Sequence, residues 1–224
     1  MTLRNKLLFV GETDTGKVRE HNEDTIAFDP DIGLLVLADG TVIEGQGFGA
    51  TGEAVGEVCF NTAMTGYQEV LTDPSYAGQI ITFTFPHIGN VGTNFEDGET
   101  SNLAARSGVR GCILRAGITE PSNYRNIAPL DGWLTARGII AISGIDTRAL
   151  TALIRDKGMP NAVIAHAPDG RFYLPALKAE AKAFPGLDGM DLVPDVTTGQ
   201  SYSWDEMRWA WGTGYAPQTA PQFH

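Results

Sequence analysis

Residues 138–158, GIIAISGIDTRALTALIRDKG, contain a short apolar run followed directly by the clearest helix pattern in the chain. The run over residues 138–143 is rich in isoleucine, as is typical of a buried β-strand. Asp146 is a good N-cap residue and Gly158 suits the position just past a helix C-terminus, so the sequence predicts a helix over Thr147–Lys157. One face of this helix is apolar, because it carries Leu150, Leu153 and Ile154.

Short strands and two more helices are predicted on both sides of this segment. The helices are expected at Leu130–Arg137, ending at Gly138, and at residues 175–184, ending before Pro185. Strands and helices do not alternate strictly, and the 27 glycines and 12 prolines favour many turns. We therefore predict a layered, mixed α and β (α/β) domain. The other strands are expected at residues 33–38, 57–61, 79–85, 109–115 and 161–165.

Residues 33–44, GLLVLADGTVIE, predict a β-hairpin. Two apolar runs flank Asp39-Gly40. An Asp-Gly pair in that place is the signal for a two-residue type I′ turn, because both central residues of that turn need positive φ.

The composition of the 224 residues excludes several classes of protein. Hydrophobic residues make up 42% and charged residues 19%, and no apolar run approaches the roughly 20 residues of a membrane span. Lysine and arginine number 16 against 27 aspartates and glutamates, and a net charge of −11 argues against nucleic acid as a partner. The first ten residues lack the apolar core of a secretory signal, so a cytoplasmic location is expected.

Neither cysteine has the setting of a catalytic nucleophile. Cys59 lies between Val58 and Phe60, and Cys112 lies in the apolar run before Ile113, so both are expected to be buried strand residues. The four histidines show no helical pairing and no clustering with cysteines, which argues against a zinc site. The sequence also contains no glycine loop of the P-loop type.

Two polar loops are the best candidates for binding a ligand. The first covers residues 61–76, where Asp73-Pro74 predicts a turn that presents Ser75 at the surface. The second covers residues 86–94, PHIGNVGTN, which follow a buried strand. Spacing alone favours a structural role for both loops.

The last segment, residues 195–224, contains three of the four tryptophans without a sustained period. These are Trp204, Trp209 and Trp211. We expect this tail to need a partner surface that covers its rings.

From about Leu35 to His224 the chain resembles the N-terminal domain of the small subunit of glutamine-hydrolysing carbamoyl-phosphate synthase. The resemblance lies in LVLADGTVIEG, GEVCFNTAMTGYQEVLTDPSYAGQIITFTFPHIGNVGTN, GIIAISGIDTRALTALIRDKG, FPGLDGMDL and the final Pro-Gln-Phe-His. These matches are long and specific, and they cover most of the chain.

The resemblance implies a three-layer β/β/α "swivelling" domain over residues 35–194. A tryptophan-rich linker over residues 195–224 would lead toward a class I glutamine amidotransferase domain. In the family, the N-terminal domain mainly holds the large synthetase subunit, which uses ATP, bicarbonate and ammonia from glutamine to make carbamoyl phosphate for pyrimidine and arginine biosynthesis. The serine of the family's DPSY motif binds glutamine, and it matches Ser75.

The amidotransferase half, with its catalytic cysteine, histidine and glutamate, has no counterpart in these residues. The resemblance therefore implies no catalytic residue and no cofactor on this chain, and no turnover by the chain alone.

Residues 1–40 resemble another family. The stretch TDTGKVREHNEDTIAFDPDIGLLVLADG looks like the opening of a bacterial type-2C metal-dependent Ser/Thr protein phosphatase, which implies metal-binding candidates at Asp24, Asp39 and Gly40. The residues after Gly40 depart from the phosphatase pattern and favour the hairpin, so no working metal site is expected. Residues 1–34 are predicted to be a poorly packed extension.

Three interpretations of function follow from the sequence. The chain is a docking and glutamine-supporting domain of the synthase, or a non-functional chimera or relic of a metal-dependent phosphatase, or a stand-alone binding module that competes for the large subunit.

Overall fold

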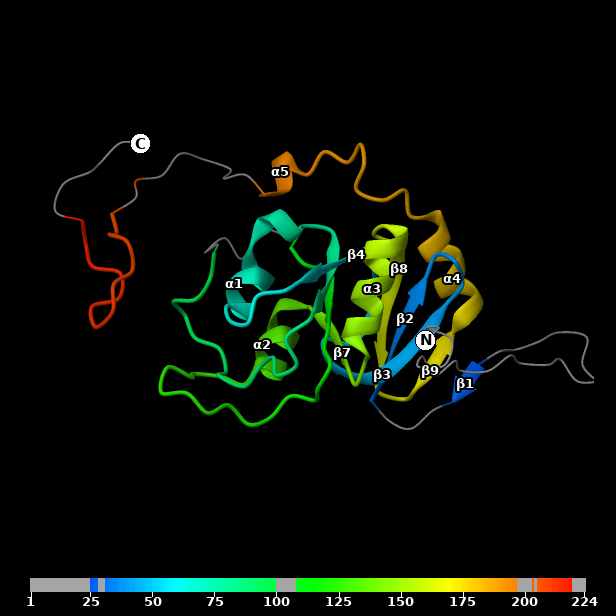
Figure 1. Cartoon of the computed structure of the whole chain (residues 1–224), viewed down its shortest axis with the longest axis horizontal. Helices are drawn as coiled ribbons and strands as arrows, with labels where there is room; N and C mark the ends of the chain where they lie inside the picture. The colour runs from blue at the N-terminus through cyan, green and yellow to red at the C-terminus, as the bar shows by residue number, and fades with distance from the viewer. Residues whose placement is uncertain (1–24, 28–30, 100–107, 197–202, 204, 219–224) are drawn as a thin grey trace, which may run out of the picture.

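The computed structural model describes residues 25–27, 31–99, 108–196, 203 and 205–218. Its main strands are β2 (Ile32–Leu37), β3 (Val42–Gly49), β4 (Gly52–Asn61), β5 (Gln79–Phe83), β6 (Gly111–Ile113), β7 (Ile140–Ser143) and β8 (Asn161–Ala167). These strands form a closed barrel in the order β2-β3-β7-β6-β5-β4-β8. Figure 1 labels β2, β3, β4, β7 and β8 of this barrel. A short strand β1 (Thr25–Ala27) pairs with β9 (Arg171–Tyr173) in a separate two-stranded sheet.

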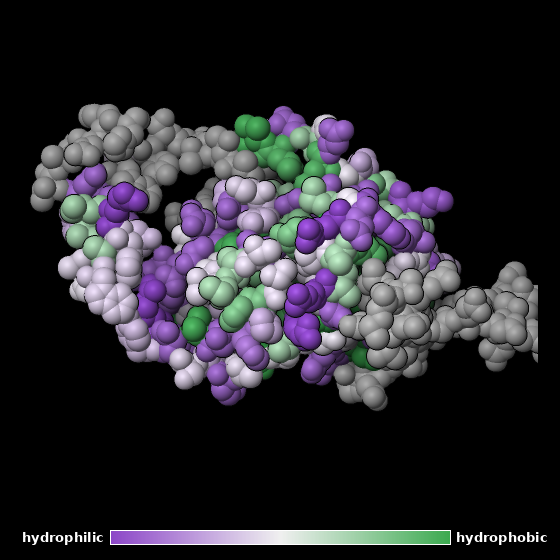
Figure 2. Space-filling model, viewed as in Figure 1, coloured by the Kyte–Doolittle hydropathy of each residue, from purple (hydrophilic) through white to green (hydrophobic). Residues whose placement is uncertain are grey.

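The helices are α1 (Tyr67–Thr72), α2 (Leu130–Arg137), α3 (Thr147–Lys157), α4 (Leu174–Ala183) and α5 (Val193–Val196), with a 3-10 turn, η2 (Pro74–Tyr76), after α1. Together with the barrel they confirm a mixed α and β fold. No helix in the described ranges is long and apolar enough to cross a bilayer. Figure 2 shows a hydrophobic patch over α5, where Val193 is exposed.

The barrel joins a parallel part to an antiparallel part. β4, β5, β6 and β7 pair in parallel with one another in that order. β2 pairs antiparallel with β3 and β8, and further antiparallel pairs, β3 with β7 and β4 with β8, close the barrel. The carboxyl ends of β4, β5, β6 and β7 therefore lie at one end of the barrel, because parallel strands point the same way.

Three hydrophobic clusters account for the core. The first fills the barrel with inward-facing residues of every barrel strand and is joined by the apolar face of α3. The second lies between β5, β6 and β7 and the helices α1 and α2, and the third lies between β2, β8 and α4. Alternate residues of one strand therefore serve different clusters: Leu35 belongs to the barrel interior, whereas Leu34 and Val36 face α4.

The barrel is narrow across its middle. A Cβ atom on Gly111 of β6 would lie 2.8 Å from Cγ2 of Ile164 on β8, and one on Gly33 of β2 would overlap Cγ2 of Ile142 on β7. These glycines let opposite walls approach one another more closely than any side chain would allow.

The predicted hairpin at residues 33–44 is confirmed, but its predicted two-residue type I′ turn is wrong. Leu37 donates to Thr41 at 2.8 Å, and Gly40 donates to Leu37 at 2.9 Å, so Ala38, Asp39 and Gly40 form a three-residue connection. Only Gly40 among them has positive φ, at 89°. A three-residue loop with a glycine in the left-handed conformation is a common alternative connection in hairpins.

Two predicted helices are confirmed to the residue. In α3, Oδ1 of Asp146 accepts the N–H of Ala149 at 3.1 Å and the N–H of Gly158 bonds Ile154. In α2, the left-handed Gly138 ends the helix as expected. The helix predicted over 175–184 begins one residue earlier and ends one residue earlier, at Leu174–Ala183.

The division of the chain at residues 34 and 194 stays a prediction, but the first boundary falls inside a strand. β2 starts at Ile32, and Leu34 is fully buried against α4. Residues 32–34 are therefore part of the barrel and not of a poorly packed extension. Most of the predicted extension, residues 1–24 and 28–30, lies outside the described residues.

Candidate functional site

Ser75 lies on η2, the turn that leads into the N-terminal end of β5. Asp73 caps this turn, because its Oδ1 accepts the N–H of Ser75 at 2.7 Å. The Ser75 side chain is exposed, as predicted, and its hydroxyl forms no hydrogen bond with any residue that the structure describes. That hydroxyl is free to donate to a ligand and to accept from it.

Hydrogen bonds with half-buried and buried neighbours hold the turn in place. Nδ2 of Asn61, the last residue of β4, donates to Oη of Tyr76 at 3.0 Å. The N–H groups of Tyr76 and Ala77 bond the carbonyls of Asp73 and Pro74, and Ala77 is buried. The Ser75 hydroxyl therefore stands on a backbone that needs little reordering when a ligand binds.

The two polar loops identified in the sequence lie against each other. Gln68 on α1 is 5% exposed, and its Nε2 donates to the carbonyl of Asn94 at 2.6 Å while its Oε1 accepts the Asn94 N–H at 2.9 Å. From the same helix, the hydroxyl of Tyr67 donates to the carbonyl of Gly92. The sequence does not predict α1, because the helix starts at a left-handed Gly66 that offers no side-chain cap.

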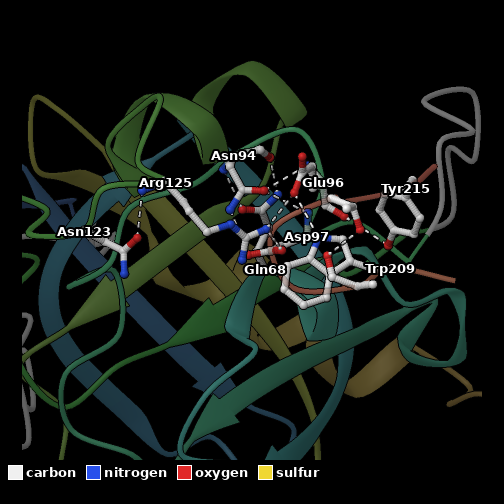
Figure 3. Close-up of polar contacts among 10 residues, drawn as sticks. Gln68, Asn94, Glu96, Asp97, Asn123, Arg125, Trp209 and Tyr215 are labelled. Atoms are coloured by element: carbon white, nitrogen blue, oxygen red, sulfur yellow. Dashed lines mark hydrogen bonds and ion pairs between the residues drawn. The ribbon is translucent and has the colours of Figure 1, made fainter.

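Arg125 gathers acidic and aromatic side chains next to these loops (Figure 3). Its Nη2 lies 2.6 Å from Oδ1 of Asp97 and 3.1 Å from Oε2 of Glu96. The guanidinium also lies over the ring of Trp209, 5.4 Å from its centroid, and Nε1 of Trp209 donates to the same Glu96 oxygen at 3.1 Å. Burial lowers the pKa of Arg125, but the hydrogen bonds and charges of the two carboxylates outweigh it and raise the pKa.

The C-terminal hairpin, defined as residues 205–218, docks on this cluster. Two isolated bridges, Glu206 with Pro217 and Ala210 with Gly214, fold it back on itself. Trp211 makes an edge contact with Tyr124 at 6.3 Å between ring centroids, yet its side chain is 77% exposed. Residues of this chain cover part of Trp209, whereas Trp211 is exposed, and the need for a partner surface stays a prediction. Trp204 lies outside the described residues.

Two pockets flank Arg125. One, of about 530 Å³, lies between the C-terminal hairpin and the loops around Glu96 and Tyr124. The other, of about 330 Å³, is lined by α1, by Asp97 and by Asn123. Ser75 lines neither pocket. Sequence reasoning missed Arg125 and its partners, because their spacing along the chain carries no motif.

The family that matches this chain is described as carbamoyl-phosphate synthase small chain, CPSase domain, and its model covers residues 35–164. The chain belongs to this family.

Relatives of the carbamoyl-phosphate synthase small chain family confirm the match over a longer stretch. The carbamoyl phosphate synthase small chains of Bradyrhizobium diazoefficiens and Mesorhizobium japonicum are 70% and 67% identical over 191 residues, which is 85% of this chain and 48% of each relative. The chain thus spans about half the length of the curated relatives it matches. Among solved structures, an aminopeptidase from Aneurinibacillus sp. strain AM-1 gives a TM-score of 0.35 at 16% identity, over 64% of this chain and 32% of that chain, which is too low to indicate a shared fold.

Within this CPSase domain both cysteines are free and buried, as predicted. Burial raises the pKa of the Cys112 thiol to about 12. Burial, followed by the charge of Glu57, raises the pKa of the Cys59 thiol to about 12 as well, against a small lowering by a backbone hydrogen bond. Both thiols are protonated at neutral pH and are therefore poor nucleophiles.

The phosphatase-like candidates do not come together as a metal site in the described part of the chain. Oδ1 of Asp39 accepts the N–H of Thr41 at 2.9 Å, and Gly40 provides the positive φ of the turn, so both serve the hairpin. Asp24 lies outside the described residues. Among those that are described, no group of three His, Cys, Asp or Glu side chains is arranged to hold a metal ion.

Proposed function

We propose that this chain acts as the docking and glutamine-supporting domain of a carbamoyl-phosphate synthase. In this role it binds the large synthetase subunit. Its Ser75 hydroxyl forms a hydrogen bond with glutamine that is bound on a neighbouring glutaminase domain. The ammonia released there feeds carbamoyl phosphate synthesis. The role requires binding surfaces and one loop hydroxyl, so it requires no cofactor on this chain.

The glutamine part of the proposal rests on the exposure and the hydrogen bonding of Ser75. Its side chain is exposed, its N–H is fixed by Asp73 at 2.7 Å, and its hydroxyl has no partner among the described residues. A held backbone with a free hydroxyl is suited to complete a site whose other residues belong to a neighbouring domain.

Exposed aromatic side chains support the docking part. Phe95, Tyr124 and Trp211 are 88%, 78% and 77% exposed, and they lie on or beside the C-terminal hairpin and the loops that it contacts. Aromatic residues are enriched where protein surfaces associate. We propose that this surface is covered in the assembled enzyme.

We also propose that the domain is the family's three-layer β/β/α swivelling fold. The layers would be the two walls of the narrow barrel and the helices that cover them. The close approach of Gly111 to Ile164 and of Gly33 to Ile142 supports this description, because it brings two walls together as facing sheets.

The glutamine role is tested in a hybrid small chain. Residues 35–224 replace the matching half of the Bradyrhizobium diazoefficiens protein, and the hybrid is expressed with its large subunit. Ser75→Ala should raise the KM for glutamine roughly 3- to 10-fold, which corresponds to one lost hydrogen bond. Synthesis with ammonia in place of glutamine should not change.

Ser122→Ala is the matched control, because Ser122 is also an exposed loop serine. It should leave both activities unchanged. An unaltered KM for glutamine in Ser75→Ala would contradict the assignment of Ser75.

Docking is tested separately with the chain as it stands. The 224-residue protein should be captured by immobilised large subunit and should release no ammonia from glutamine by itself. Failure of capture would contradict the docking role without affecting the test of Ser75.

A further inference from the structure

Three arginines line one pocket at the carboxyl ends of the parallel strands. The pocket has a volume of about 600 Å³. Its lining consists of Thr62, Thr84, Pro86, Arg115, Arg148, Thr151, Ala152 and Arg155. Thr62 follows β4 and Thr84 follows β5, so the lining threonines mark the strand ends, where ligands often bind in α/β proteins.

The arginine pocket is built largely by α3. Arg148 and Arg155 are two helical turns apart on one face, and Thr151 lies between them. The opposite face of α3 carries Leu150, Leu153 and Ile154 into the barrel core, which fixes the direction of the arginine face. Figure 2 shows hydrophilic residues gathered over α3 in the centre of the view.

The third arginine comes from the loop after β6. Nη1 of Arg115 lies 3.8 Å from Oδ1 of Asp146, the residue that caps α3. The contact is long and the Arg115 side chain is 52% exposed, so this ion pair is weak and leaves most of the guanidinium available.

The charge of the pocket is compensated only in part, by the long ion pair of Arg115 with Asp146. None of its lining residues is acidic, and neither Arg148 nor Arg155 forms an ion pair with a residue in the ranges that the structure describes. This concentration of positive charge occurs in a chain with a net charge of −11. An anion attracted here would therefore be held by local contacts and not by the field of the whole protein.

We propose that the arginine pocket binds an oxyanion of the phosphate class, free or carried on a small phosphorylated compound. A phosphate group offers several charged oxygens, which guanidinium forks bind from more than one side, and the hydroxyls of Thr62 and Thr84 add neutral donors. A single carboxylate has two oxygens and one charge, so it would leave guanidinium groups unpaired in a space of this size.

This site is separate from the role proposed for Ser75. Ser75 precedes the N-terminal end of β5, whereas the arginine pocket lies beyond its carboxyl end. A failed test of the arginine pocket would therefore not contradict the role proposed for Ser75, and the reverse also holds.

The test is calorimetric titration of the 224-residue chain with inorganic pyrophosphate at low salt. We expect a dissociation constant below about 1 mM and a rise in the thermal unfolding midpoint. The double variant R148Q/R155Q should weaken binding at least tenfold, on the order expected for the loss of charged hydrogen bonds. Circular dichroism verifies that the variant is folded.

The double variant R171Q/K178Q is the matched control. It removes the same amount of charge from two exposed positions on β9 and α4, outside the pocket, and should change the dissociation constant less than about twofold. Equal weakening by both double variants would overturn the site in favour of general charge attraction, and so would no binding at all.

Further titrations identify the ligand class. Succinate should bind much more weakly than pyrophosphate, and equal affinity would overturn the phosphate assignment in favour of carboxylates. Inorganic phosphate and glycerol 3-phosphate distinguish the source. Tighter binding of the ester assigns the pocket to a phosphorylated compound, whereas tighter binding of phosphate assigns it to the free anion.

Discussion

Gln68 and Asn94 are joined by two hydrogen bonds that imitate one rung of a β-ladder. The side-chain amide of Gln68 donates to the Asn94 carbonyl at 2.6 Å and accepts from its N–H at 2.9 Å. A single buried side chain thereby fixes the loop that follows β5 against α1.

Gln68→Ala should lower the free energy of unfolding by about 2–3 kcal/mol, because it leaves a backbone donor and acceptor of Asn94 without their partner. Urea denaturation measures the change. Gln79→Ala is the control, since Gln79 makes one half-buried side-chain bond to Glu57 at 3.2 Å, and it should cost less than about 1 kcal/mol. Equal losses in the two variants would contradict the bridging role of Gln68.

Gly33→Ala should destabilise the barrel by about 1–3 kcal/mol, because the new methyl group overlaps Ile142 across the interior. In an Ile142→Ala background the cost of Gly33→Ala should fall by roughly half, since the opposing side chain is gone. Gly132→Ala on α2 is the control: apart from its chain neighbours and the backbone of its own helix, nothing lies within 4 Å of the new Cβ, so it should stabilise the protein by about 0.5–1 kcal/mol. Thermal unfolding measures the stability change in each of these variants. If Gly33→Ala destabilises the protein equally with and without Ile142→Ala, direct overlap of the two side chains is contradicted.

Glu69 gives the stability a specific pH dependence. Its pKa is raised above the ordinary 4.5, mainly because the side chain is partly buried. The charges of Asp97 and Glu99 raise the pKa further, whereas a hydrogen bond from its own backbone and the charge of Arg125 lower it. Because the folded-state pKa is raised, the folded protein holds this proton more tightly than the unfolded chain. The stability contributed by this group is present at low pH and is lost as the pH rises through the folded-state pKa.

Glu69→Gln removes this titration, so its gain in stability over the parent chain should be larger at pH 7 than at pH 4. Urea denaturation at the two pH values provides the comparison. A gain that is the same at both would show that the carboxylate is not disfavoured in the fold.

Arg125→Ala should release the C-terminal hairpin, because it removes the ion pairs to Glu96 and Asp97 and the contact with Trp209. The effect on global stability should be small, about 1 kcal/mol, since the pairs are partly exposed. Acrylamide quenching of tryptophan fluorescence should increase. Arg137→Ala is the control, because the Arg137 guanidinium lies 4.1 Å from the ring centroid of Trp133 on α2, away from the hairpin. If quenching increases as much in Arg137→Ala as in Arg125→Ala, the release of the hairpin is contradicted.

Cys59 and Cys112 should resist alkylation by iodoacetamide at pH 8 in the native protein, because both thiols are buried and burial raises their pKa to about 12. Both should react fully once the chain is unfolded in guanidinium chloride. Mass spectrometry counts the modified residues. Rapid labelling of either cysteine in the native protein would show that its strand opens readily.

The sequence predicted the regular elements better than the links between them. The helix Thr147–Lys157 was predicted to the residue because its cap, apolar face and final glycine all agree. Closure into a barrel was not predicted, because it depends on pairs such as β2 with β8 that are distant in the chain. The role of Ser75 was inferred from a motif and stays a prediction, whereas Gln68 and Arg125 make contacts with distant residues that no local pattern reveals.

Closure of the barrel also sets an order of events during folding. One edge of β2 can pair early with β3, its neighbour in the hairpin, but its other edge must wait for β8, where Ile32 meets Ala167. Such distant pairing is slow, since the entropy of closing the long loop is lost before the contact is gained. A ribosome making this protein therefore exposes a half-paired, fully apolar strand until the last strand of the barrel has emerged, and that interval is when the nascent chain most needs protection from aggregation.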